Sequence, residues 1–123
     1  MQFAVETKGL TKKFVENFAV NGLDIQVRTG EIFGLVGPDG AGKSTTMRLI
    51  STAMTPTSGE AVVLGFDSVK QEEEIRDRIG YMPQRFALYG ELTVDENINF
   101  FADIYGVKKD ELAQKKNELL DFT

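Results

Sequence analysis

The stretch that decides the fold is GPDGAGKST, at residues 37–45. It matches the phosphate-loop pattern G-x-x-x-x-G-K-[ST] at all four constrained positions, which are Gly37, Gly42, Lys43 and Ser44. Residues 31–36 before the loop are mostly apolar and predict a short strand, while residues 43–53 after it predict a helix. Glycines allow a backbone to wrap phosphates, and the N–H groups that begin a helix are free to bind them. The sequence therefore predicts a phosphate site at the start of this helix.

The residues of this loop have separate predicted roles. Lys43 is expected to reach the β- and γ-phosphates as a point charge. The Ser44 hydroxyl is expected to bind Mg²⁺, and backbone N–H groups of residues 40–45 to cradle the α- and β-phosphates. The residues expected to contact nucleotide through the loop are Gly37, Pro38, Asp39, Gly40, Ala41, Gly42, Lys43, Ser44 and Thr45. A flexible glycine-rich turn is the alternative, and the strand and helix predicted on either side argue against it.

Composition limits the classes of protein that fit. The chain has 123 residues, enough for one domain with a modest core. Its net charge of −5 argues against a nucleic-acid surface, which needs clustered Lys and Arg. The sequence contains no cysteine and no histidine, so disulfides, thiolate metal sites and histidine catalysis are excluded within it. No membrane-length apolar run or secretory signal is visible, and we expect a cytoplasmic location.

The pattern of the remaining residues predicts a β-rich beginning and a helical end. Further strands are expected over residues 2–10, 23–27, 60–64 and 79–82, with a loop at 11–14 and a tight turn at 21–22. Helices are expected over residues 71–78, from 94 until Gly106 ends the second, and over 110–122. Thr93 and Glu96 match a capping box. The helix after the phosphate loop is expected to turn Met47, Ile50 and Met54 to one face.

Several further stretches carry a resemblance to a known family. They are LTKKF at 10–14, GEIFGLVGP at 30–38, TSGE at 57–60, GFD at 65–67, YMPQ at 81–84 and LYGELTVDEN at 88–97. Together with the phosphate loop (the Walker A motif), they resemble the ATP-binding-cassette (ABC) ATPases over essentially the whole chain. The sequence is most similar in character to the ATP-binding subunits of bacterial multidrug or ABC-2-type exporters.

The resemblance implies an α/β fold: a P-loop NTPase core with an N-terminal antiparallel β subdomain and the start of a helical subdomain. Residues 1–84 would form the β subdomain and P-loop core, and residues 85–123 the Q-loop and the start of the helical subdomain. The family's signature sequence, catalytic glutamate and switch histidine find no match here, so the resemblance implies the N-terminal part of one nucleotide-binding domain.

The resemblance also implies roles for individual residues. Phe14 would stack on the adenine ring, with Ala19 and Val20 beside it. Gln84 would complete the Mg²⁺ shell and help to place the attacking water, and residues 85–91 would face a permease. At position 39 this sequence has Asp, where the family more often has Asn, Ser or Thr, and we expect that side chain to face solvent.

The implied function is that of an ATP hydrolase of ABC type. Its cofactors would be ATP and Mg²⁺, and two nucleotide-binding domains would sandwich the nucleotide to drive export through a transmembrane permease. The protein would then lie on the inner face of the membrane, and this chain alone is expected to bind ATP or ADP without turnover. The alternatives are a soluble ABC ATPase not linked to transport, a P-loop kinase or GTPase, and a non-catalytic nucleotide-binding module.

Overall fold

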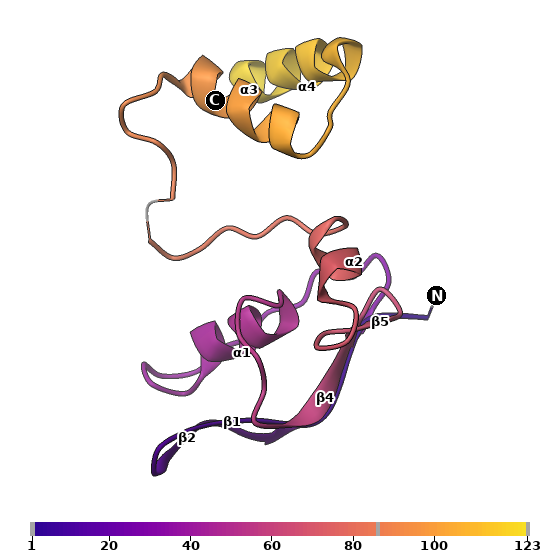
Figure 1. Ribbon diagram of the computed structural model, residues 1–123, viewed down its shortest axis with the longest axis vertical. Coiled ribbons are helices and arrows are strands. Elements are labelled where there is room, and N and C mark those ends of the chain that lie inside the picture. Colours follow the sequence, from indigo (N-terminus) through magenta and orange to yellow (C-terminus); the bar gives the residue numbers. More distant parts are fainter. Residues whose placement is uncertain (1, 86, 123) are drawn as a thin grey trace. The chain divides into compact units, whose positions relative to one another are not determined.

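The computed structural model describes residues 2–85 and 87–122 and divides into two compact units. The first unit ends at Tyr81 and the second begins at Met82. Figure 1 traces the elements of each unit in chain order. The phosphate loop and its helix belong to the first unit.

The first unit is built on an antiparallel sheet. Its strands are β1 (Phe3–Phe14), β2 (Asn17–Leu23), β3 (Gln26–Arg28), β4 (Ser58–Val63) and β5 (Phe66–Asp67). They are ordered β2-β1-β4-β5, with β3 also paired to β1, and every pairing among the described residues is antiparallel. The predicted N-terminal antiparallel β subdomain is therefore confirmed.

The long strand β1 corrects the prediction of a loop at residues 11–14. Lys12 pairs with Val20 and Phe14 with Asn17, so these residues form a hairpin with β2. The hairpin turns at residues 15–16, and not at 21–22 as predicted. Gly22, with φ of 66°, lies within β2 opposite a register shift in β1. A glycine in the left-handed region suits such a bulge as well as a tight turn, which is why the Asn-Gly signal was misleading.

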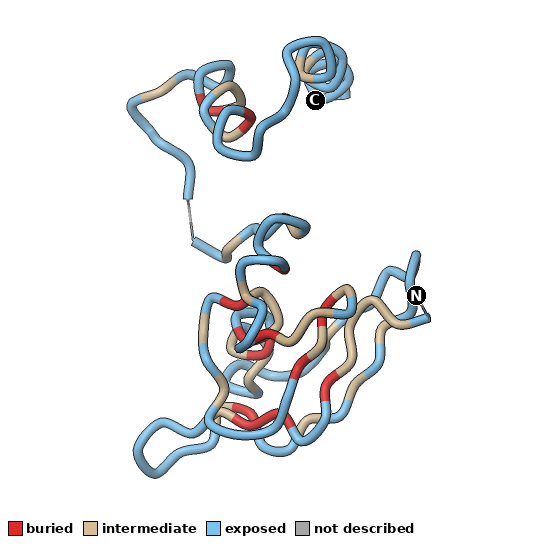
Figure 2. Tube along the Cα trace, turned by 45° about the vertical axis from the view of Figure 1, so that its right-hand side comes forward, coloured by how far each residue is buried: buried red, intermediate tan, exposed pale blue. Residues whose placement is uncertain are grey.

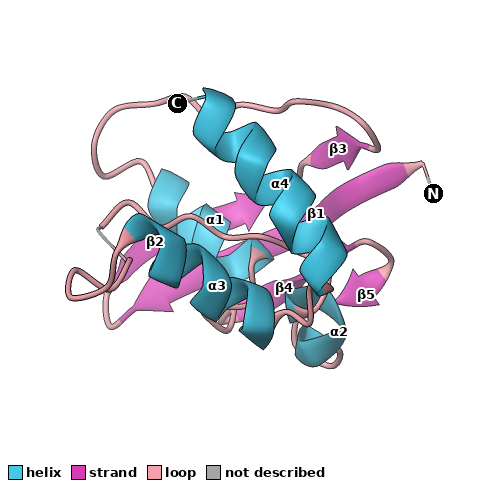
Figure 3. Ribbon diagram, turned by 90° about the horizontal axis from the view of Figure 1, so that it is seen from above, coloured by secondary structure: helices cyan, strands magenta, loops and turns pink. Residues whose placement is uncertain are grey.

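Two helices accompany the sheet in the first unit, α1 (Lys43–Ile50) and α2 (Glu72–Arg76). Both are shorter than predicted; α1 ends where Thr52 takes a left-handed φ of 68°. Figure 3 shows both helices with the strands of the sheet. Arg76 Nε of α2 donates a hydrogen bond of 2.9 Å to Thr52 Oγ1, which ties α2 to the segment directly after α1.

The core of the first unit lies between α1 and the sheet. Figure 2 shows the buried positions on the strands and on the helices beside them. The buried cluster consists of Leu10, Val20, Leu49 and Ala61, with Leu23 and Met54 packed against it. Thr46 and Leu49 are the buried residues of α1, whereas Met47 is exposed. The residues expected to share one face are thus separated: Met47 is exposed, whereas Met54, beyond the end of α1, packs against the core.

Residues 31–36 and 79–82, both predicted as strands, are irregular in the structure. The side chains of Ile32 and Val36 are fully exposed, and none of the described strands pairs with either segment. An apolar run forms a strand only when neighbouring strands accept its hydrogen bonds. Both segments have the sequence of a buried strand but no partner among the described residues.

The second unit contains α3 (Val94–Ile104) and α4 (Lys109–Phe122). The predicted capping box is confirmed: Thr93 Oγ1 accepts from the Glu96 N–H at 3.1 Å, and Glu96 Oε1 accepts from the Thr93 N–H at 3.0 Å. The predicted end of α3 is also confirmed, because Gly106 follows the helix in the left-handed conformation.

An ion pair joins the two helices of the second unit. Lys116 Nζ of α4 lies 2.7 Å from Asp95 Oδ1 of α3, and it also donates to Asn99 Oδ1 at 2.8 Å. Neither helix buries a wide apolar face, and α4 has no buried residue among those described. The ion pair is therefore a prominent contact between them.

The packing of β4 on β1 predicts a large cost for Gly59→Ala. A Cβ at Gly59 would lie 2.0 Å from the Gly9 carbonyl oxygen, and the φ of 77° is already unfavourable for alanine. We expect the free energy of unfolding to fall by about 3 kcal/mol or more, measured by urea denaturation. Gly30→Ala is the control, because Gly30 has a similar φ of 82° with nothing within 4 Å, and should cost only about 1 kcal/mol. Equal costs would contradict a steric role for Gly59.

The Asp95–Lys116 pair predicts a pH dependence in the second unit. The hydrogen bond and charge of Lys116 hold the pKa of Asp95 below its ordinary value. A carboxyl with a lowered folded-state pKa stabilises the fold above its unfolded pKa, and this contribution is lost as the pH falls through the lowered folded pKa. In Lys116→Met, an NMR titration should find the pKa of Asp95 raised toward its ordinary value. Lys115→Met should leave it unchanged, since Lys115 pairs with Glu118 instead.

Candidate nucleotide-binding site

The phosphate loop enters α1 through a glycine that packs directly on the sheet. Gly42 is the N-cap of α1 and has a left-handed φ of 94°. A Cβ built on Gly42 would lie 2.1 Å from the carbonyl oxygen of Ala19, in β2, and 3.5 Å from Val20 Cγ2. Only glycine fits this conformation at this distance. The end of the phosphate loop is therefore held against the β1–β2 hairpin.

The N-terminus of α1 is open to an anion. Gly42 has no side chain to cap the helix, and the first turn contains no acidic residue. The first backbone bond of the helix runs from the Thr46 N–H to the Gly42 carbonyl oxygen, at 2.9 Å. The N–H groups of Lys43, Ser44 and Thr45 precede that bond and point toward the helix start, where the dipole favours negative charge. These features fit a phosphate group.

The Lys43 ammonium lies inside the curve of the loop. It donates hydrogen bonds to the carbonyl oxygens of Gly37 and of Pro38, the latter at 2.7 Å. The Ala41 N–H also donates to the Pro38 carbonyl oxygen, at 3.2 Å. Lys43 thus closes the loop on itself through contacts of the kind that phosphate oxygens can replace.

The side chains around the loop fit Mg²⁺ bound together with a nucleotide. No group of three or more acidic residues that could hold a metal occurs in the described part of the chain. Mg²⁺ bound with a nucleotide needs few protein ligands, because phosphate oxygens and water fill most of its shell. Ser44 is exposed at the helix start and offers such a hydroxyl, and Asp39 is exposed, as expected.

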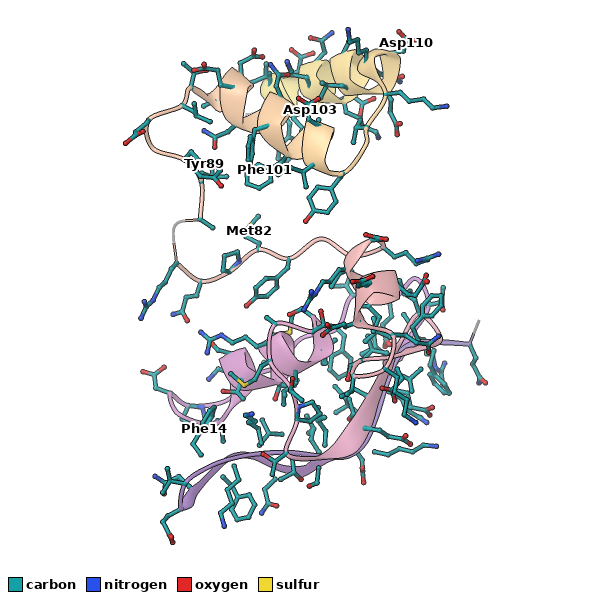
Figure 4. All side chains as sticks on the ribbon, in the orientation of Figure 1. Phe14, Met82, Tyr89, Phe101, Asp103 and Asp110 are labelled. Carbon is teal, nitrogen blue, oxygen red and sulfur yellow. The ribbon has the colours of Figure 1, made fainter. Side chains whose placement is uncertain are left out.

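The predicted adenine contact lies at the end of the hairpin. Phe14 is the last residue of β1 and is 47% exposed. Figure 4 labels it on the side of the hairpin toward α1. Val20 was expected beside the same pocket, but it belongs to the buried core beneath Gly42. Phe14 and residues 37–45 thus both belong to the first unit.

Gln84 lies outside this group. It is exposed and belongs to the second unit. Residue 86, within the segment 85–91 that was expected to face a permease, lies outside the described residues.

Asn97 organises the segment before α3, which the sequence did not reveal. Its side chain is buried; Oδ1 accepts from the Tyr89 N–H at 3.0 Å, and Nδ2 donates to the carbonyl oxygens of Tyr89 and Leu92. The ring of Tyr89 packs on two rings of α3, with centroids 5.0 Å from Phe100 and 6.3 Å from Phe101. Figure 4 labels Tyr89 and Phe101. The only hint in the sequence is the position of Asn97 directly after the capping-box glutamate.

Comparison with known proteins identifies the class. The family model described as ABC transporter matches residues 20–122. The chain therefore belongs to the ABC transporter family, a family of ATP-hydrolysing proteins. No helix in the described ranges is long and apolar enough to cross a membrane.

Individual relatives show what the chain is similar to. It is 48% identical over 104 residues to the probable multidrug ABC transporter ATP-binding protein YbhF of Escherichia coli (strain K12), covering 85% of this chain and 18% of that protein. It is 35% identical over 118 residues to the linearmycin resistance ATP-binding protein LnrL of Bacillus subtilis (strain 168), covering 96% of this chain and 38% of that protein. The chain thus spans less than half the length of these relatives.

Solved structures confirm the fold class. An ATP-binding subunit of an ABC transporter matches with a TM-score of 0.77 and 31% identity, over 87% of this chain and 45% of that one. The dimeric ATP-binding cassette MJ0796, in a post-hydrolysis state bound to ADP and Pi, matches with a TM-score of 0.79 and 27% identity, over 95% and 56%. The prediction of an incomplete ABC ATPase core is confirmed.

The contacts of Asn97 predict a local effect of Asn97→Ala. The variant leaves the Tyr89 N–H without its acceptor, so the segment before α3 should open more often. Hydrogen exchange at the Tyr89 amide should accelerate about tenfold or more. Asn99→Ala is the matched control, because the Asn99 amide donates to the exposed Asp95 side chain and not to a backbone group. Unchanged exchange in Asn97→Ala would show that the aromatic packing alone holds the segment.

Proposed function

We propose that this chain is the nucleotide-binding part of an ABC transporter ATPase, and that it binds MgATP through Phe14 and residues 37–45. The observation that carries the proposal is the start of α1, which has no side-chain cap. Gly42 holds this helix start against the sheet at a point where no side chain would fit. Membership of the ABC transporter family makes ATP the expected nucleotide.

Within this proposal each residue of the loop has a defined task. Lys43 exchanges the carbonyl oxygens of Gly37 and Pro38 for β- and γ-phosphate oxygens, which carry more negative charge. Backbone N–H groups of residues 40–45 bind the α- and β-phosphates. Ser44 ligates Mg²⁺, which supplies charge neutralisation at the phosphates. Phe14 stacks on the base.

Hydrolysis needs more than this group of residues. In the proposed assembly Gln84 contributes to the metal shell and helps to orient water. We infer that the catalytic glutamate and switch histidine of the family are not supplied by this sequence, which contains no histidine. We therefore expect this chain alone to bind ATP or ADP without turnover.

The proposed partners are a transmembrane permease and a second nucleotide-binding domain. The name of YbhF, a probable multidrug ABC transporter ATP-binding protein, supports the first, and the dimeric state named for MJ0796 supports the second. Residues 85–91 would face the permease, with the protein on the inner face of the membrane. Residues 1–84 would then serve as the β subdomain and P-loop core, and residues 85–123 as the Q-loop and the start of the helical subdomain.

Calorimetric titration with MgATP tests the proposal. Lys43→Ala removes a charged donor to the phosphates, so the Kd should rise about 10- to 100-fold. Lys70→Ala is the control, because it removes the same charge from an exposed position after β5 and should leave the Kd unchanged.

Two outcomes would count against the proposed function. Equal affinities of Lys43→Ala and the unchanged chain would mean that nucleotide does not bind at this loop. The absence of saturable binding by the unchanged chain would mean that this chain does not hold a competent site.

A further inference from the structure

Two lysine–phenylalanine pairs lie at the end of the β1–β2 hairpin. The Lys12 ammonium lies 5.4 Å from the centroid of the Phe14 ring, and the Lys13 ammonium 5.2 Å from that of Phe18. Lys13 and Phe18 are cross-strand partners. The pairing of β1 with β2 shifts its register between Lys12 and Lys13, so the two pairs occupy separate positions along the hairpin. They are chemically alike and differ in what surrounds them.

The Lys12 pair is tied to the segment that follows α1. Lys12 Nζ donates a hydrogen bond of 2.7 Å to the carbonyl oxygen of Thr55, and Lys12 is half-buried. The backbone is joined at the same place, because the Thr57 N–H donates to the Thr11 carbonyl oxygen at 2.9 Å. Lys13, in contrast, is exposed. The Lys12 ammonium is thus held by a carbonyl oxygen while it lies over the Phe14 ring.

This arrangement leaves one face of Phe14 for a ligand. The ammonium attracts the π electrons on one face of the ring, so a second flat group can stack only on the other face. The contact of Lys12 with Thr55 places the pair on the α1 side of the hairpin, where Gly42 packs on Ala19. A cation on the far face also draws electron density away from the stacking face, which lessens repulsion between the ring and an electron-rich base.

We propose that Lys12 is a positioning residue for the adenine base: it fixes the Phe14 ring from behind and links that ring to the segment after the phosphate-binding helix. This role depends on the nucleotide-binding function proposed for Phe14 and residues 37–45. Lys12 does not touch the nucleotide. Its effect should therefore be limited to the affinity for the base and should not extend to the phosphates.

Titration with two ligands separates these effects. Magnesium tripolyphosphate carries three linked phosphates without a base, whereas MgATP carries both. For Lys12→Met, the Kd for MgATP should rise about two- to fivefold, as expected for a partly exposed cation–π contact, and the Kd for tripolyphosphate should not change. Lys12→Arg keeps a cation over the ring and should retain most of the MgATP affinity.

The second pair of the hairpin supplies the matched control. Lys13→Met removes the same charge and the same type of ring contact one residue away, and should change neither Kd. In a Phe14→Leu background, Lys12→Met should have no further effect on MgATP, because there is no ring left to position. This comparison also covers the case in which a single variant folds poorly, since each double variant is compared with its own parent.

Several results would overturn the role of Lys12. An equal loss for tripolyphosphate would mean that Lys12 acts on the phosphates or on the whole fold. The same loss in Lys13→Met would mean a general charge effect. If the unchanged chain bound tripolyphosphate and MgATP equally, the base would contribute nothing, and the positioning role would fail while the phosphate site stood. If it bound neither ligand, the proposed function and the role of Lys12 would fail together.

Discussion

The candidate site depends on one steric constraint, the contact between Gly42 and the carbonyl oxygen of Ala19. No side chain fits at Gly42, because a Cβ there would lie 2.1 Å from that oxygen. The contact holds the beginning of α1 against the β1–β2 hairpin. A helix start with unpaired N–H groups and the aromatic ring of Phe14 consequently belong to one packed unit, although nearly thirty residues separate them in the chain.

Two lysine side chains add further contacts around this packed helix start. Lys43 closes the phosphate loop from within, while Lys12 connects the end of the hairpin to the segment after α1. Both ammonium groups donate hydrogen bonds to backbone carbonyl oxygens, but the two lysines have different proposed roles. In the proposed site Lys43 would exchange its carbonyl partners for phosphate oxygens, whereas Lys12 keeps its contacts with Thr55 and Phe14.

The parts of the fold that were predictable from sequence are those whose cause is local. The phosphate loop, the start of the helix at Lys43 and the capping box of Thr93 and Glu96 each depend on residues within a few positions of one another. The strands expected at residues 31–36 and 79–82 were wrong, because a strand also needs hydrogen-bonding neighbours. The loop expected at residues 11–14 was wrong for the opposite reason: pairing with β2 makes these residues part of strand β1.

The candidate site shows the same difference between local sequence signals and contacts formed by tertiary packing. Motif spacing pointed to residues 37–45, because a loop of this pattern is expected to wrap phosphates with its own backbone. It did not identify Lys12 or Asn97, whose partners are Thr55 in one case and the backbone of Tyr89 and Leu92 in the other. Such contacts arise from tertiary packing, and a lysine beside a phenylalanine or an asparagine in a helix carries no distinctive signal by itself.

The central claim is that one nucleotide spans from the start of α1 to the ring of Phe14. Its most direct test is an NMR study of this chain with MgADP. We expect nuclear Overhauser contacts between the adenine protons and the Phe14 ring, together with large amide shifts confined mainly to residues 37–45. Saturable binding with shifts elsewhere, or adenine contacts to other residues and none to Phe14, would contradict it.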